Sequence, residues 1–159
     1  MSLDSLCVYK EIEIASAKPT FEERGDIIHF GIDEVYPNVE FDVIKFIELY
    51  KKAKDYAFKN DKNLIIVGGT GFYLKALIDG LSQGIETKIK LDIPQEDAYD
   101  LLYKIDKEYM EKIEKNDRYR IEKAYAIYKQ TSLGPTQYFQ KNPKIAVAKD
   151  LKIFEILWD

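Results

Sequence analysis

The chain has 159 residues, of which 46% are hydrophobic and 33% are charged, and its net charge at neutral pH is −4. This composition is typical of a globular domain with a hydrophobic core, and the acidic balance excludes a uniformly basic nucleic-acid groove while allowing a local basic patch. Cys7 is the single cysteine, which excludes an internal disulfide and argues against a zinc site, and no membrane span or signal peptide is visible, so the cytoplasm is the expected location.

The first ten residues are expected to contain a strand and its exit, because Leu6 and Val8 are apolar at alternating positions. Chains seldom begin inside a core strand, so we expect an earlier segment to be missing. Residues 11–26 are predicted as a loop with a short acidic turn, and residues 27–33 as an edge strand or a buried connection. From Glu40 onward, an apolar stripe at helical spacing predicts an amphipathic helix of about 18 residues.

The most informative stretch is residues 63–77, which read NLIIVGGTGFYLKAL. Four consecutive apolar residues predict a strand buried on both faces, as in a parallel sheet. Three glycines and Thr70 then predict a sharp turn into a short helix that Gly80 ends. A turn of this kind brings backbone amides and a helix N-terminus to the ligand-binding edge of an α/β sheet. Thr70 is placed to cap the helix or to offer its hydroxyl to a ligand.

The second half of the chain is predicted to be mainly helical. One helix is expected over residues 96–115, and a second is expected to begin after an N-cap at Asn116 or Asp117 and to end near Gln130. Residues 151–159 are rich in apolar side chains, and we predict that they form a strand. Together the elements predict an α/β core formed by residues 1–82 and 131–159, with a helical insert and RNA-facing helices over residues 83–130.

Three motifs in this order resemble the bacterial tRNA dimethylallyltransferases, the adenine-37 isopentenyl transferases. Residues 4–10 (DSLCVYK) with residues 14–19 (IASAKP) are similar to the family's DSxxVY…GTAKP block. Residues 67–77 with the GLS at residues 80–82 resemble its GGTGLYL helix and exit. Residues 116–121 (NDRYRI), with Ala124 and Tyr128, resemble its NDxxR…AxxxY helix. The resemblance implies a P-loop NTPase-like parallel sheet flanked by helices, and it covers residues 4 to about 138.

The family's chemistry assigns roles to these residues. The N6 amine of adenine-37, in tRNAs that read codons beginning with U, attacks C1 of dimethylallyl diphosphate, and a carboxylate accepts the proton. The resemblance implies that Asp4 is this base and that Thr70 belongs to the same catalytic site. It also implies contacts with the tRNA anticodon stem-loop and Mg²⁺ for the complete enzyme; no membrane is expected, and no protein partner is implied. The implied tRNA-contacting residues are Asp4, Ser5, Leu6, Cys7, Thr70, Tyr119, Arg120, Ile121, Glu122 and Lys123.

Departures from the family pattern are also visible. The chain contains no Gly-Lys pair, so the GxxxxGK[ST] loop that holds the diphosphate is absent, and no residue here is assigned to a cofactor or a metal. Cys7 stands where the family most often has Gln, and the segment between Ser82 and Asn116 is shorter than usual. With the first strand, the phosphate loop and the C-terminal helices missing, we expect an inactive fragment that exposes apolar surface and is marginally stable or self-associating.

Three alternatives remain open from the residues alone. An adenylate isopentenyltransferase would prenylate a free nucleotide, and the Arg120 helix argues modestly against it. A non-catalytic RNA- or nucleotide-binding module is favoured by the missing phosphate loop. A nucleoside-phosphate kinase relative ranks last, because it needs the same loop and no lid-type arginine cluster is visible.

Overall fold

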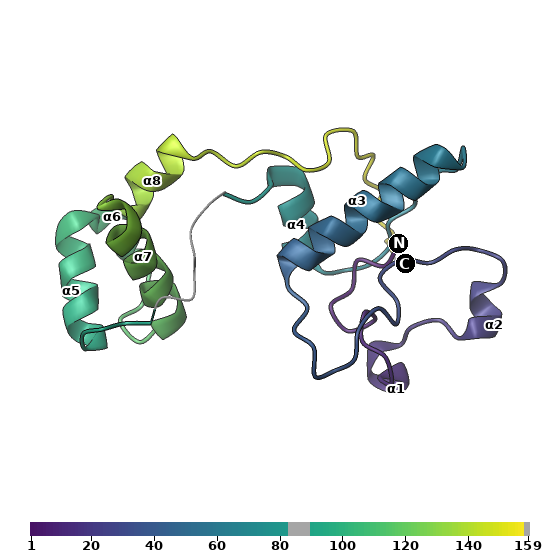
Figure 1. The fold of residues 1–159 in the computed structure, drawn as a ribbon, viewed down its shortest axis with the longest axis horizontal. Helices are drawn as coiled ribbons and strands as arrows, with labels where there is room; N and C mark the ends of the chain where they lie inside the picture. The colour runs from purple at the N-terminus through teal and green to yellow at the C-terminus, as the bar shows by residue number, and fades with distance from the viewer. Residues whose placement is uncertain (83–89, 158–159) are drawn as a thin grey trace. The chain divides into compact units, whose positions relative to one another are not determined.

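The computed structural model describes residues 1–82 and 90–157, which group into two compact units. The first unit comprises Met1–Gly80 with Ala146–Asp159, and the second comprises Leu81–Ile145. Each unit has its own set of helices (Figure 1). The sequence-based division assigned residues 131–145 to the α/β core, whereas here the helix over Pro135–Lys141 contacts helices of the second unit.

The first unit contains the helices α1 (Glu13–Ser16), α2 (Phe21–Arg24), α3 (Val43–Lys59) and α4 (Gly71–Asp79). The long helix predicted from the apolar stripe is α3, with 17 residues. It begins at Val43 because Asp42 accepts hydrogen bonds from the amides of Ile44 and Lys45, which have no helical partner. α4 packs against α3, where the rings of Phe46 and Tyr73 stack with centroids 4.3 Å apart.

The strand predictions for this unit are wrong in extent. Among the described residues, backbone pairing amounts to two isolated parallel bridges, Ser2 with Val67 and Tyr9 with Val35. Ile65 and Val67 are 70% and 64% exposed, although the sequence indicated burial on both faces. A parallel strand is normally covered on both faces and paired on both edges. Within the described ranges, the segment before Gly68 pairs only with residues at the start of the chain.

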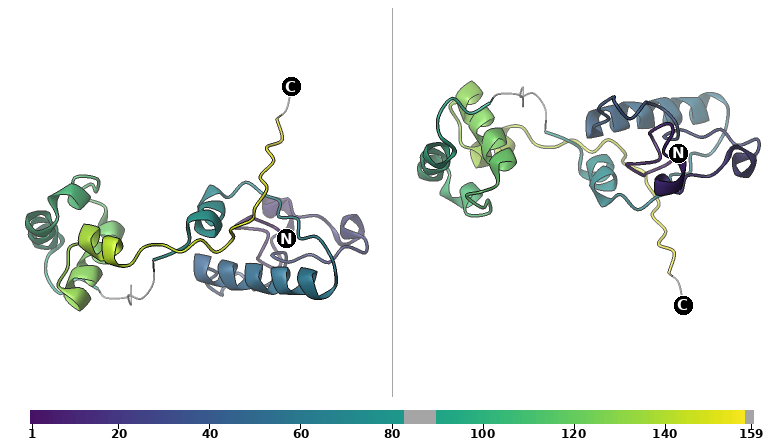
Figure 2. Two further views of the ribbon diagram at one scale, coloured as in Figure 1. Left: turned by 90° about the horizontal axis from the view of Figure 1, so that it is seen from above. Right: turned by 90° about the horizontal axis from the view of Figure 1, so that it is seen from below.

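The segment after residue 145 also lacks the predicted strand. The amides of Val147 and Ala148 donate to the carbonyl of Leu77, so this part of the chain is fixed at the C-terminal end of α4. Residues 151–157 are extended, without a bridge partner in the described part of the unit (Figure 2). The last two residues of the predicted strand, Trp158 and Asp159, lie outside the described residues.

The second unit is a bundle of α5 (Gln95–Ile105), α6 (Lys107–Met110), α7 (Arg118–Thr131) and α8 (Pro135–Lys141). α7 begins after Asp117, whose side chain accepts from the Arg120 amide, so of the two caps that the sequence allowed, Asn116 and Asp117, the helix uses the second. Apolar side chains from α5, α6 and α7 form the core of the unit, and the fully buried members are Ala98, Leu102, Met110, Ile121 and Ala124.

The single helix predicted over residues 96–115 is wrong, because the chain breaks at Asp106. This buried carboxylate accepts from the Tyr109 amide, which caps α6. It also accepts from the amide and the hydroxyl of Thr136 at 2.6 and 2.9 Å. Asp106 thus ends α5 with its amide, which donates to the Leu102 carbonyl, while its side chain begins α6 and ties it to α8. Hydrophobic periodicity alone could not reveal this break.

Exposed apolar side chains gather on the first unit. A groove of about 750 Å³ is lined in part by Ile27, Ile28, Ile65 and Val67, each of which is more than half exposed. No helix in the described ranges is long and apolar enough to cross a membrane. An exposed apolar groove of this kind is typical of surfaces that contact other proteins.

We expect the isolated chain to self-associate at micromolar concentration, because burying these side chains is favourable by roughly 25 cal/mol per Å². Sedimentation velocity over a hundredfold concentration range should show a mass above 18.6 kDa. Replacing exposed Ile65 and Val67 with threonine should shift the distribution toward monomer. A wild-type chain that stays monodisperse and monomeric, with a sharp and high melting transition, would contradict this expectation.

Candidate active site

The backbone around Leu3 sets the register of the site. The amino group of Met1 donates to the Ile65 carbonyl at 2.7 Å, and the Val67 amide donates to the Met1 carbonyl at 3.0 Å. The Leu3 amide then donates to the Val67 carbonyl at 2.7 Å. This parallel pairing ends at Leu3 on one side and Val67 on the other, so Asp4 and the glycine turn leave the same end of the pair.

The turn at Gly68 brings Thr70 next to Asp4. The Thr70 amide donates to the Leu3 carbonyl at 3.2 Å, so Thr70 is hydrogen-bonded to the peptide unit that carries Asp4. This close approach requires glycine at position 68, where φ is +151° and an added Cβ would lie 2.4 Å from the Leu3 carbonyl oxygen. The two residues predicted to form the catalytic site are therefore neighbours in space, although 66 positions separate them in the sequence.

Thr70 occupies the N-cap position of α4, as predicted. Its carbonyl accepts the amides of Tyr73 and Leu74, whereas its side chain makes no capping hydrogen bond. Of the two roles that the sequence allowed for the Thr70 hydroxyl, it does not cap the helix, and the ligand contact stays a prediction.

Asp4 organises the turn that follows it. Its Oδ1 accepts the Leu6 amide at 2.7 Å and the Cys7 amide at 3.0 Å, which is the Asx-turn geometry that aspartate favours. The second oxygen, Oδ2, accepts no backbone amide in the described chain. The backbone contacts of this carboxylate thus use Oδ1 alone.

The remaining residues of this turn differ in accessibility. Ser5 and Leu6 are exposed, while Cys7 is buried with its Sγ 3.5 Å from the Ser16 carbonyl. Burial raises the pKa of the Cys7 thiol, and the negative charge of Asp4 adds to this effect although the Ser2 hydroxyl opposes it. Cys7 is therefore a neutral thiol at physiological pH and packs as a small apolar group rather than acting as a nucleophile.

The other predicted RNA-contacting residues lie on the first turns of α7, in the second unit. Tyr119 is 69% exposed and the Nζ of Lys123 lies 5.2 Å from its ring centroid. Arg120 pairs with Asp117, and Glu122 pairs with Arg118 at 2.9 Å. Ile121 is completely buried, which corrects its predicted role: an RNA contact there would have to come from the backbone.

Sequence reasoning missed two residues next to this site. Lys18 is almost completely buried and binds Asp33, which in turn donates its amide to the Cys7 carbonyl. Lys18 belongs to the IASAKP block, but its partner Asp33 lies 15 residues further along, so the block alone does not indicate this ion pair. Among the described residues, no group of three or more His, Cys, Asp or Glu side chains could hold a metal ion.

Comparison with known proteins places these residues in a family context. The IPP transferase family model matches residues 7–158. Over its whole length the chain is 80% identical to a tRNA dimethylallyltransferase of Aliarcobacter butzleri and covers 55% of that protein. It is 50% identical over 161 aligned positions to the tRNA dimethylallyltransferase of Nautilia profundicola, of which it covers 54%. The chain thus spans about half the length of the curated relatives it matches.

Two solved structures share its fold. A eukaryotic dimethylallyltransferase acting on tRNA superposes with a TM-score of 0.70 and 29% identity, over 89% of this chain and 37% of that one. The tRNA isopentenylpyrophosphate transferase of Bacillus halodurans superposes with a TM-score of 0.51 and 29% identity, over 84% and 47% of the respective chains.

Proposed function

The chain belongs to the IPP transferase family, and from this premise we propose that it contributes the catalytic base and RNA contacts for dimethylallyl transfer to tRNA. The substrate atom is N6 of adenine-37 in tRNAs that read codons beginning with U, and the donor is dimethylallyl diphosphate. The observation that carries the proposal is the juxtaposition of Asp4 and Thr70 through the Thr70–Leu3 hydrogen bond. The P-loop NTPase-like parallel sheet expected for this family is part of the same proposal.

In the proposed reaction, the N6 lone pair forms a bond to C1 of the donor while the bond from C1 to the diphosphate oxygen breaks. Pyrophosphate leaves with that electron pair, and the N6 proton passes to Oδ2 of Asp4. The amine needs this base because its lone pair is delocalised into the purine ring. A base positioned in this way contributes about 10²- to 10⁴-fold to the rate.

The diphosphate and Mg²⁺ are not assigned to residues of this chain. The described residues offer no carboxylate, His or Cys cluster suited to a metal ion, and the sequence has no Gly-Lys pair. The described part of the chain therefore provides no binding site for either group. The proposed contribution of the chain is limited to the base, the adjoining hydroxyl of Thr70 and the RNA contacts.

RNA recognition is proposed to use the start of α7. An exposed tyrosine with cationic side chains around it can stack on a splayed base while the cations contact phosphates. Tyr119 has this exposure, and Arg118, Arg120 and Lys123 lie within one turn of it. This arrangement favours RNA over the free nucleotide that an adenylate isopentenyltransferase would bind.

The test is equilibrium binding of a fluorescent anticodon stem-loop with A36-A37-A38, with AMP as competitor. We expect saturable binding that AMP does not displace, and a loss of about tenfold in affinity for Tyr119→Ala, since base stacking contributes about 1–3 kcal/mol. Tyr103→Ala is the matched control, because Tyr103 also lies under a lysine, Lys107, but on α5. Displacement by AMP would favour the free-nucleotide enzyme, and equal loss in both variants would contradict the role of α7.

A further inference from the structure

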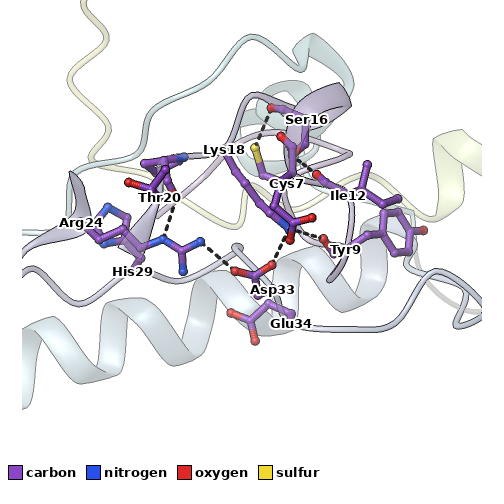
Figure 3. Close-up of polar contacts among 12 residues, drawn as sticks. Cys7, Tyr9, Ile12, Ser16, Lys18, Thr20, Arg24, His29, Asp33 and Glu34 are labelled. Carbon is purple, nitrogen blue, oxygen red and sulfur yellow. Dashed lines mark hydrogen bonds and ion pairs between the residues drawn. The ribbon is translucent and has the colours of Figure 1, made fainter. Parts of the chain in front are cut away.

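A cluster of ion pairs around a buried lysine lies beside the turn that carries Asp4. The Lys18 side chain is 2% exposed, and its Nζ donates to Asp33 Oδ1 at 2.6 Å and to the Tyr9 carbonyl at 2.9 Å. It also pairs with Glu13 Oε1 at 3.2 Å. The three acceptors match the three hydrogens of the ammonium group. Figure 3 shows the Lys18 side chain reaching Asp33.

The cluster is completed by Arg24, whose position follows from the local sequence. Thr20 and Glu23 form a reciprocal capping box that starts α2, and Arg24 is the last residue of this helix. Its Nη2 donates to Asp33 Oδ2 at 2.7 Å, and its Nε donates to the Pro19 carbonyl at 3.0 Å. Both oxygens of the Asp33 carboxylate are therefore held by cations (Figure 3).

The cluster is joined directly to the C-terminal side of the Asp4 turn. The Asp33 amide donates to the Cys7 carbonyl at 3.0 Å, and Lys18 holds the carbonyl of Tyr9. The N-terminal side of the turn is held separately by the Leu3 contacts with Val67 and Thr70. Residues 4–7 are thus clamped at both ends, while the exposed Ser5 and Leu6 take no part in either clamp.

We propose that Lys18 and Asp33 are positioning residues that hold the turn of residues 4–7 in the conformation that binds the anticodon loop. This inference rests on the proposed function, and it assigns to Lys18 and Asp33 no contact with RNA. A buried ammonium group with no spare hydrogen has nothing to offer a phosphate, so its effect on RNA must pass through the turn.

The charge states support this arrangement. Burial alone would lower the pKa of Lys18, but the hydrogen bonds and charges of Asp33 and Glu13 outweigh it and raise the pKa above its usual value. Burial alone would raise the pKa of Asp33, and the hydrogen bonds and charges of Lys18 and Arg24 outweigh it and lower the pKa. Both groups stay charged across the neutral range, so the clamp does not open when the pH changes near 7.

The test compares Lys18→Met with Lys59→Met. The control removes the same charge from the same unit, but Lys59 lies in an exposed ion pair with Asp55 at the end of α3. Both variants lose one positive charge and therefore the same nonspecific electrostatic attraction to RNA. A difference in affinity between them thus measures the effect of the contacts that hold residues 4–7. The readouts are affinity for the stem-loop and amide hydrogen exchange at Leu6 and Cys7, whose amides bind Asp4.

We expect Lys18→Met to lose about tenfold or more in stem-loop affinity and to lose amide protection at Leu6 and Cys7, while α3 and α7 stay protected. Lys59→Met should change affinity by no more than about twofold. If Lys18→Met does not fold, Asp33→Asn serves in its place, because it keeps the backbone amide that binds Cys7. If Lys18→Met loses amide protection at Leu6 and Cys7 but binds the stem-loop with wild-type affinity, the inference is overturned while the proposed function stands. No binding by the wild-type chain would overturn the proposed function and the inference together, whereas the exchange data would separately report whether Lys18 holds the turn.

Discussion

A Gly68→Ala substitution is expected to separate the two halves of the candidate site. The new Cβ would lie 2.4 Å from the Leu3 carbonyl oxygen and 2.6 Å from its carbonyl carbon, at a φ of +151° that alanine rarely adopts. The backbone of residues 67–70 must then move away from Leu3, which breaks the Thr70–Leu3 hydrogen bond. We expect the first unit to lose about 1–3 kcal/mol of stability, from backbone strain and overpacking.

Gly69→Ala is the matched control, because a Cβ there would meet nothing within 4 Å and its φ is not in the left-handed region. Urea unfolding followed by tyrosine fluorescence would measure both variants, and stem-loop binding would show whether the site survives. Equal stability of the two variants would contradict the register that places Asp4 beside Thr70.

An Asp4→Asn substitution is expected to abolish transfer without disturbing the turn. The asparagine carbonyl can still accept the amides of Leu6 and Cys7, as Asp4 Oδ1 does, but an amide nitrogen replaces the oxygen that takes the proton. Transfer should fall by about 10²- to 10⁴-fold, whereas stem-loop affinity should change by less than about threefold.

Asp4→Ala removes both functions and should lower the rate and the affinity together. The measurement is single-turnover transfer to a stem-loop, in a version of the chain extended to the length of its curated relatives. An Asp4→Asn variant that turns over at the wild-type rate would show that another group accepts the proton.

The sequence predicted the positions of the helices more accurately than it predicted the pairing of the strands. The apolar stripe after Glu40 predicted α3 within a few residues, and Asp117 was recognised as a cap, because both signals lie within one or two turns of the helix that they specify. The break at Asp106 was missed, since it depends on Thr136, which lies 30 positions away. The strands were overpredicted for a similar reason: four apolar residues indicate burial, but partners on both edges must be present to provide it.

In the candidate site, too, local motifs could be predicted from the sequence, whereas contacts between distant residues could not. The glycine turn and the Asp4 motif were visible separately, and only the Leu3–Val67 register shows that they meet. The clamp was not predicted, because a lysine in a loop is ordinarily a solvated surface charge. Its burial results from contacts with Asp33 and the Tyr9 carbonyl, which no periodicity encodes. Ile121 was assigned to the RNA surface by resemblance alone, and the apolar stripe of α7 explains why it is buried instead.

The most direct test of the central claim is transfer of labelled dimethylallyl groups to an unmodified anticodon stem-loop with A36-A37-A38, in the presence of Mg²⁺. This chain and the version extended to the length of its relatives would be assayed in parallel, each with and without Asp4→Asn. We expect label on N6 of adenine-37 with the extended version, a loss of that label with Asp4→Asn, and no transfer by the 159-residue chain alone. Stem-loop binding by the extended version without any transfer would contradict the enzymatic assignment and leave an RNA-binding module.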